Sequence, residues 1–255
     1  GPYSNPIGLQ LRGQPFLCFV LQGRTPQLVL GVSQQAMPGF RHLRDLRGRR
    51  IAVRSLGSAG HRLSRLLLAR AGLAPQDVHY QVFNGPAATV DALRSGQADA
   101  LCYHDPAITR LEQGGELRVV VDTRTLRGNA DVFGGPLPAG CLSAPVSYVD
   151  QHPQQCQAMA DAMVRALKWL QTAGPSDLNK TVPESHFAGD RALYLAAFAR
   201  ARESWVPDGL MPERGPQTVL RALAQFGDAQ QLQQVDLAQT FTNRFAQAAK
   251  TRFRA

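Results

Sequence analysis

The sequence predicts an α/β protein in which parallel-rich sheets are flanked by helices and followed by a mainly helical C-terminal region. Two observations carry this prediction. Between residues 16 and 121, short apolar runs typical of strands alternate with segments of helical periodicity, and the connections are short. Such alternation indicates βαβ units. After residue 145, apolar residues recur mainly at helical spacing.

The individual elements follow from apolar runs bounded by Gly, Pro and polar turn residues. We expect strands at residues 16–21, 27–32, 51–54, 78–82, 99–103, 117–121 and 141–144. A helix is predicted at about residues 59–71, a second begins at Pro86, and a third begins at Asp105-Pro106. Further helices are expected at about residues 153–172, 189–204, 215–226 and 236–252.

The charge of the chain is basic but dispersed. The sequence has 28 Lys and Arg against 19 Asp and Glu, a net charge of +9, and most of the cations are Arg. They form no block along the chain, so we expect a solvated basic surface and no nucleic-acid partner. An Arg in a cleft would still suit an anionic ligand.

Motifs for catalysis, metal binding and membrane spanning are absent from the sequence. It contains no phosphate-binding loop, dinucleotide fingerprint, zinc-protease motif or nucleophile elbow, and no long apolar run. Its six His residues are scattered, and its four Cys residues match no zinc pattern. We therefore expect no metal, no cofactor and no catalysis. Buried free thiols are expected, with one disulfide left open in an oxidising compartment.

The loop Ser55-Leu56-Gly57-Ser58-Ala59-Gly60-His61 is the candidate binding site. Ser58 is a favourable N-cap for the helix that follows. Gly57 and Gly60 would let a ligand approach the backbone, and the hydroxyls of Ser55 and Ser58 add donors. His61 falls in the first helical turn. A helix start of this kind suits a carboxylate, sulfonate or phosphate oxygen, although an ordinary capped helix shows the same pattern.

Several segments occur in an order typical of one protein family. They are LRDLRGRRIAVRSLGSAGH at 43–61, LLLARAGL at 66–73, NGPAA at 84–88, VDALRSGQADA at 90–100 and DPAITRLE at 105–112. Together they resemble the periplasmic solute-binding proteins of the nitrate/sulfonate/taurine branch of ABC transporters, which is similar to the thiamine-pyrimidine precursor proteins. The resemblance covers about residues 16–145.

The resemblance implies a two-lobed fold of the type II periplasmic-binding-protein kind, with a ligand between the lobes. Mapped onto this chain, lobe 1 is 1–45 plus 137–255, and lobe 2 is 46–136. The crossings would lie near residues 31–33 and 133–139. The implied ligand-binding residues are Ser55, Gly57, Ser58, His61 and Asp105, with Asp105 capping a second helix that faces the ligand.

The implied function is that of a non-catalytic receptor. It would capture a small anionic or polar organic solute, such as a sulfonate-, nitrate-, taurine- or pyrimidine-like molecule, and deliver it to an ABC permease in the inner membrane. Its location would be periplasmic, or lipid-anchored outside the inner membrane. Two alternatives stay open: an enzyme like those of pyrimidine-precursor synthesis, and a ligand-sensing regulatory domain.

Members of that family normally begin with further βα units before the strand at residues 16–21. These units are missing from this sequence, so we expect lobe 1 to lack part of its sheet. An incomplete sheet exposes a strand edge and apolar surface. Such a chain is expected to oligomerise, exchange segments or bind ligand poorly.

Overall fold

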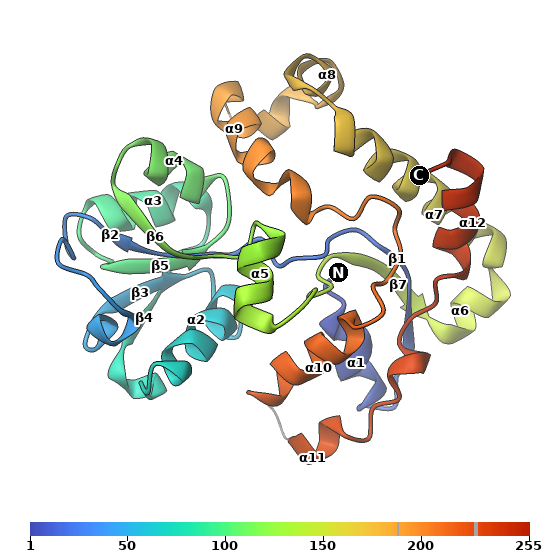
Figure 1. The fold of residues 1–255 in the computed structure, drawn as a ribbon, viewed down its shortest axis with the longest axis horizontal. Helices are drawn as coiled ribbons and strands as arrows, with labels where there is room; N and C mark the ends of the chain where they lie inside the picture. The colour runs from blue at the N-terminus through green and yellow to red at the C-terminus, as the bar shows by residue number, and fades with distance from the viewer. Residues whose placement is uncertain (188, 227–228) are drawn as a thin grey trace. The chain divides into compact units, whose positions relative to one another are not determined.

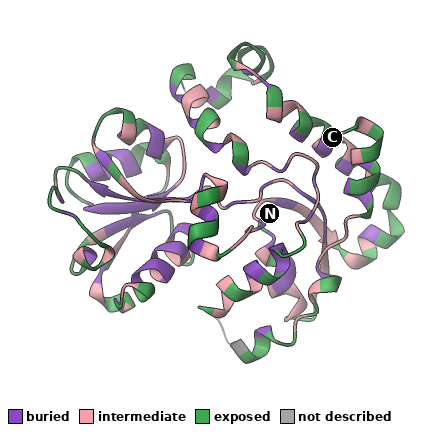
Figure 2. Cartoon of the chain, viewed as in Figure 1, coloured by how far each residue is buried: buried purple, intermediate pink, exposed green. Residues whose placement is uncertain are grey.

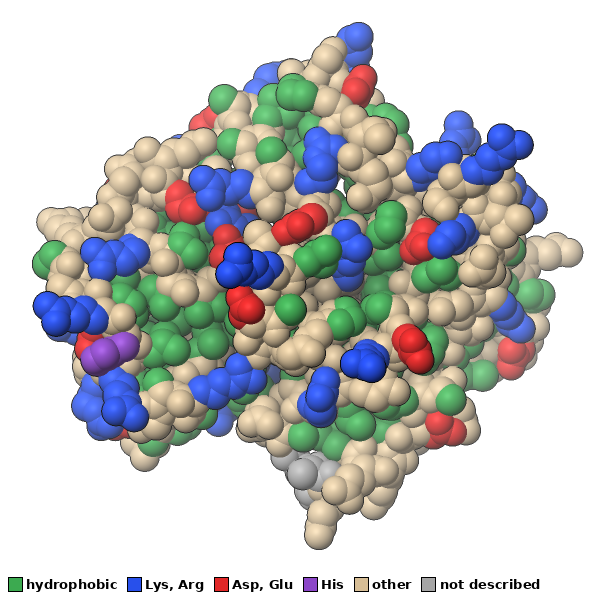
Figure 3. Space-filling model, viewed as in Figure 1, with side chains coloured by type: hydrophobic (Ala, Val, Ile, Leu, Met, Phe, Trp, Pro, Cys, Tyr) green, Lys and Arg blue, Asp and Glu red, His purple; other side chains and the backbone are tan. Residues whose placement is uncertain are grey.

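A computed structural model describes residues 1–187, 189–226 and 229–255 (Figure 1). The chain divides into two compact units. Unit 1 consists of Gly1–Pro26, Thr125–Thr181 and Ala201–Ala255, and unit 2 consists of Gln27–Arg124 and Val182–Arg200. Basic and acidic side chains are interspersed over the face shown in Figure 3, in keeping with their spread along the sequence.

Unit 2 contains a five-stranded sheet with the strand order β4–β3–β5–β2–β6. Its strands are β2 (Val29–Ser33), β3 (Arg50–Val53), β4 (His79–Val82), β5 (Ala100–Tyr103) and β6 (Leu117–Asp122). β3 pairs in parallel with β4 and β5, whereas β2 runs antiparallel to β5 and β6. The expected strands are therefore confirmed, and the parallel pairing holds for one half of the sheet.

The direction of β2 follows from how the chain enters and leaves unit 2. Leu28, just before β2, and Thr123, just after β6, are hydrogen-bonded to each other through N–H···O contacts of 2.8 and 2.9 Å. The chain thus enters the sheet before β2 and leaves it after β6 at one and the same edge. A strand that starts at that edge must run opposite to the strands that end there.

Helices cover both faces of the unit 2 sheet. α2 (Ala59–Arg70) lies on one face, and α3 (Pro86–Arg94) and α4 (Ala107–Gln113) lie on the other (Figure 1). The central strands β2 and β5 are buried along their whole length, as Figure 2 shows, whereas the edge strand β4 is partly exposed. Coverage on both faces explains why these strands are continuous apolar runs.

Unit 1 is mainly helical around one two-stranded sheet. β1 (Phe16–Leu21) pairs antiparallel with β7 (Cys141–Pro145). α7 (Pro153–Thr172) and α12 (Arg244–Phe253) pack on each other and on β1. The remaining helices of the chain are α1 (Ser4–Gln10), α5 (Leu126–Phe133), α6 (Val146–Gln151), α8 (Pro175–Thr181), α9 (Arg191–Ala201), α10 (Gly215–Ala224) and α11 (Ala229–Leu232).

The helix expected at residues 236–252 is wrong in its first half. The structure has a short 3-10 turn at Leu237–Gln239, and α12 begins at Arg244. The intervening segment pairs with β1 instead: the N–H of Cys18 donates to the carbonyl of Thr240, and the N–H of Thr242 donates to the carbonyl of Cys18. Backbone groups used in this way cannot continue a helical ladder.

The boundaries of the two units differ from those expected for the lobes. Residues 27–45 and 182–200 belong to unit 2, and residues 125–136 belong to unit 1. Residues 27–45 belong to unit 2 because β2, which lies within this range, pairs with β5 and β6. A pair of lobes that closes on a solute stays a prediction.

The four cysteines, Cys18, Cys102, Cys141 and Cys156, are buried and free, as expected. The thiols of Cys18 and Cys141 are in contact on the paired strands β1 and β7, and this contact, followed by burial, raises the pKa of Cys18. Within the described residues, no helix has the length and apolar character needed to cross a membrane.

Candidate functional site

The candidate site lies at the edge of the unit 2 sheet where its parallel strands end. β3, β4, β5 and β6 all point to this edge, because β2 is antiparallel to both β5 and β6. The residues that follow them are Arg54, Asn84, His104-Asp105 and Arg124. In open α/β sheets, ligands characteristically bind outside the carboxyl ends of the strands.

The loop after β3 is closed by its own hydrogen bonds. The hydroxyl of Ser58 donates to the carbonyl of Ser55 at 2.7 Å and accepts from the N–H of His61 at 3.3 Å. The N–H of Gly57 donates to Nδ1 of His61 at 2.9 Å. Gly57 has a φ of 81°, a conformation that few residues other than glycine adopt. The predicted N-cap role of Ser58 is confirmed.

Gly60 does not serve ligand approach, contrary to the expectation from the sequence. It is buried in the first turn of α2. A Cβ at this position would lie 2.4 Å from the carbonyl oxygen of Cys102 in β5. Gly60 therefore allows the helix to pack closely on the sheet.

The pKa of the histidine of this loop is lowered. Burial lowers the pKa of His61, and the charges of Arg65 and Arg62 lower it further. Because Nδ1 accepts a hydrogen bond, the neutral ring carries its proton on Nε2. The ring packs edge-on against Tyr80 at 4.4 Å between centroids, and the Tyr80 hydroxyl lies 3.1 Å from that of Ser64.

Arg54 and His104 extend the candidate site beyond the residues chosen from the sequence. Arg54 is exposed directly after β3. Its charge adds to burial in lowering the pKa of His104, which follows β5. The position of Arg54 in the sequence, between an apolar strand and a glycine-containing loop, does not by itself distinguish it from other exposed Arg residues. Burial is the main cause of the lowered pKa of both histidines, and the charges of Arg54, Arg62 and Arg65 add to it.

The pH dependence of stability should report on His104. Burial and the charge of Arg54 lower its pKa from 6.5, and Asp105 offsets part of this effect. A His with a depressed pKa contributes stability above the unfolded pKa, and this contribution is lost as pH falls through the folded pKa. We expect the free energy of unfolding to decline below pH 6.5 less steeply in His104→Gln than in the parent chain. Urea titrations at pH 7 and pH 5 measure this; parallel declines would contradict it.

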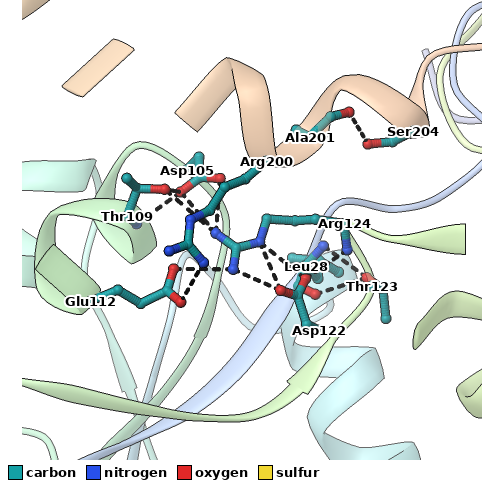
Figure 4. A network of polar contacts seen from close by, with 10 residues as sticks. All are labelled: Leu28, Asp105, Thr109, Glu112, Asp122, Thr123, Arg124, Arg200, Ala201 and Ser204. Atoms are coloured by element: carbon teal, nitrogen blue, oxygen red, sulfur yellow. Dashed lines mark hydrogen bonds and ion pairs between the residues drawn. The ribbon is translucent and has the colours of Figure 1, made fainter. Parts of the chain in front are cut away.

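Asp105 lies in a buried ion network centred on Arg124 (Figure 4). Arg124 is 1% exposed and contacts Asp122 at 2.7 Å, Glu112 at 3.1 Å and Asp105 at 3.2 Å. Arg200 pairs with the other oxygen of Glu112 at 3.0 Å. Burial alone would lower the pKa of Arg124, but the contact with Asp122 and the three negative charges outweigh it and raise this pKa.

The same network limits what Asp105 can do for a ligand. Its Oδ1 accepts from the N–H of Thr109 at 2.9 Å and from the Thr109 hydroxyl at 2.7 Å, which fixes the start of α4. The structure thus gives Asp105 internal partners on both sides. It brings Ser55, Gly57, Ser58 and His61 together in one loop and places Asp105 after a different strand at the same edge.

Solved structures with the same fold show which class of protein this chain resembles. The chain has the fold of periplasmic binding proteins: it matches a putative sulfonate ABC transporter periplasmic sulfonate-binding protein of Methylobacillus flagellatus KT with a TM-score of 0.71 and 22% identity over 98% of this chain and 73% of that one. The nitrate-binding protein of Synechocystis PCC 6803 matches with a TM-score of 0.67 and 13% identity over 98% and 72%.

The sequence profile of the NMT1-like family matches residues 30–181, and the chain belongs to this family. A protein of known structure from Bordetella bronchiseptica RB50 is 41% identical, with a TM-score of 0.91 over 100% of this chain and 80% of that one. A desulfurization enzyme, DszB, shares the fold at a TM-score of 0.62 and 18% identity over 98% and 83%. No protein with a curated description matches the chain.

Proposed function

We propose that this protein is the solute-binding receptor of an ABC importer, and that the loop of residues 54–61 holds the anionic group of a small organic solute. The observation that carries the proposal is the loop at the carboxyl edge of the unit 2 sheet, where Arg54 is exposed and the N–H of Gly57 holds the ring of His61. Membership of the NMT1-like family and the shared fold support the same reading.

The chemistry of the loop suits a sulfonate, carboxylate or nitrate group. Arg54 would supply a charge-assisted pair, and the hydroxyl of Ser55 and the Nε2 proton of His61 would donate hydrogen bonds. Ser58 and Gly57 would hold the loop in shape, since their polar groups already contact Ser55 and His61. Asp105 would act by fixing the loop after β5 rather than by touching the solute.

We also propose a cellular location and a partner for this receptor. A receptor of this kind would work in the periplasm, or anchored outside the inner membrane, and would pass its solute to a membrane permease. Two of the proteins that share its fold are described as periplasmic binding proteins for sulfonate and nitrate. Self-association also stays a prediction, and sedimentation velocity of the purified chain would measure it.

Binding by this loop is tested with the double variant Gly57→Val/Ser58→Ala and with Arg54→Gln. Calorimetric titration with sulfonates, carboxylates, nitrate and pyrimidines first finds the solute class, and a ligand at 100 times its Kd should also stabilise the native state by about 2.7 kcal/mol. Both variants should then bind at least about tenfold more weakly, which is about 1.4 kcal/mol.

Two controls separate binding from folding. Gly48→Val introduces the same kind of strain in unit 2, at a φ of 72°, with no atom near the new side chain. Arg49→Gln removes an exposed charge just before β3, at the opposite end of the strand from Arg54. These controls should bind like the parent. Equal affinity in the loop variants and the controls would overturn the proposal.

Catalysis is the alternative function, because DszB is an enzyme with this fold. A receptor returns its solute unchanged. Incubating the protein with each bound solute and analysing the mixture by mass spectrometry separates the two functions, since stoichiometric recovery supports the receptor and turnover supports the enzyme.

A further inference from the structure

Unit 1 contains a cavity of about 560 Å³ that is separate from the candidate site in unit 2. Its wall is mostly apolar and comes from α5 and from the segment that follows Trp205, including Leu126, Val206, Leu210 and Met211. A volume of this size is within the range of small-molecule sites in proteins.

The wall also carries a cation that forms no ion pair within the described residues. Arg24 lines the cavity, and its Nε donates to the backbone carbonyl of Glu203 at 2.9 Å. Among the residues that the structure describes, no carboxylate oxygen lies within 4.0 Å of its guanidinium nitrogens. Asp208, the acidic residue of the wall, is already paired with Lys250 at 2.7 Å. The carboxylate of Glu203 also contacts the wall, where its Oε1 accepts from the N–H of Leu126 at 3.0 Å, so Arg24 is a cation with no ion pair of its own on a wall that carries both signs of charge.

A second polar group of the wall also lacks a partner. Asn129 is 1% exposed, and its Nδ2 donates to the carbonyl of Gly135 at 2.8 Å. Its Oδ1 is buried and has no hydrogen-bond partner within the described part of the chain. An amide oxygen accepts hydrogen bonds, so a bound molecule or a water that donates one would satisfy it.

We infer that the unit 1 cavity binds an organic monoanion, with its apolar body against the wall of α5 and its charged group on Arg24. The guanidinium offers the planar pair of donors that suits a sulfonate or carboxylate. The inference stands apart from the proposed function, because the loop of residues 54–61 belongs to unit 2 and none of its residues lines this cavity.

The test uses benzenesulfonate as the probe and methionine methyl NMR as the readout. The chain has four Met residues, of which Met211 lines the cavity and Met37 lies in unit 2. Benzenesulfonate should shift the Met211 signal with saturation and leave Met37 unmoved. Sulfate, which lacks the apolar body, and methyl phenyl sulfone, which lacks the charge, should bind at least tenfold more weakly.

Three variants are titrated with benzenesulfonate in the same way. Arg24→Gln should lower the affinity for benzenesulfonate at least tenfold, whereas Arg127→Gln removes an exposed charge of α5 outside the cavity and should change it less than twofold. Ala130→Phe should block binding by filling the cavity from an exposed helix position while keeping Arg24.

Retention of the Met211 shift in Arg24→Gln, or no shift in the parent at 20 mM benzenesulfonate, would overturn the inference. A saturable affinity for benzenesulfonate that leaves Met211 unmoved would also overturn it, because the probe would then bind elsewhere than in this cavity. The variant Gly57→Val/Ser58→Ala keeps the two questions apart: it should lose binding at the loop and retain the Met211 shift.

Discussion

Replacing Arg124 with Met should destabilise unit 2 by about 3–5 kcal/mol, the usual cost of removing one partner from a buried ion network. The loss is large because Asp105, Glu112 and Asp122 would lose their shared cation while staying close together. Met has a comparable length, so lost packing contributes little. Urea unfolding followed by circular dichroism measures the effect.

Two companion variants identify its cause. Arg47→Met makes the same substitution in an exposed pair with Asp77, where Arg47 is 62% exposed, and should cost no more than about 1 kcal/mol. Arg124→Met/Asp122→Asn should recover part of the stability by removing one of the unpaired charges. A cost for Arg124→Met as small as that of Arg47→Met would show that solvent, rather than Arg124, neutralises the three carboxylates.

Replacing Gly60 with Ala should destabilise the protein by about 1–3 kcal/mol, the range typical of overpacked sites. The added methyl group would lie 2.4 Å from the carbonyl oxygen of Cys102. A backbone atom in a buried strand cannot move aside as the end of a flexible side chain can. α2 would have to lift away from β5, and the loop of residues 54–61 would shift with it.

The matched control for this prediction is Gly8→Ala. Gly8 lies inside α1, and no atom is within 4 Å of a Cβ built there. In an open helical position the change from glycine to alanine should stabilise by about 0.5–1 kcal/mol. Thermal unfolding of both variants should therefore give shifts of opposite sign. A neutral Gly60→Ala would mean that α2 has room to adjust.

The sequence allowed the local elements of unit 2 to be predicted because each depends on short-range signals. Apolar runs marked the strands, Ser58 marked the start of α2, and Pro86 marked the start of α3. The antiparallel direction of β2 was not predictable in the same way. It depends on the contact of Leu28 with Thr123, residues that no local pattern connects.

In the candidate site, too, features that depend on neighbouring residues were predictable and features that depend on distant residues were not. The loop geometry around Ser58 and His61 follows from neighbours within four residues, and the prediction of the N-cap was confirmed. The role of Arg124 was missed because Asp105 and Glu112 are 19 and 12 residues away along the chain and meet it only in the fold, although Asp122 is a close neighbour in the sequence. Arg54 was passed over because an exposed Arg gives no distinguishing signal until the strand ends are placed together.

The placement of β2 also governs the order in which unit 2 can form during synthesis. β2 is made first among the strands of its sheet, yet its partners β5 and β6 are made much later, and Leu28 bonds to Thr123 across 95 residues. Long loops must close before such contacts form, which slows folding. A growing chain whose last residue is Tyr103 still lacks β6, so one edge of β2, which is buried in the finished sheet, is open to other chains. Unit 2 therefore completes its sheet only when the ribosome has moved well past Asp122.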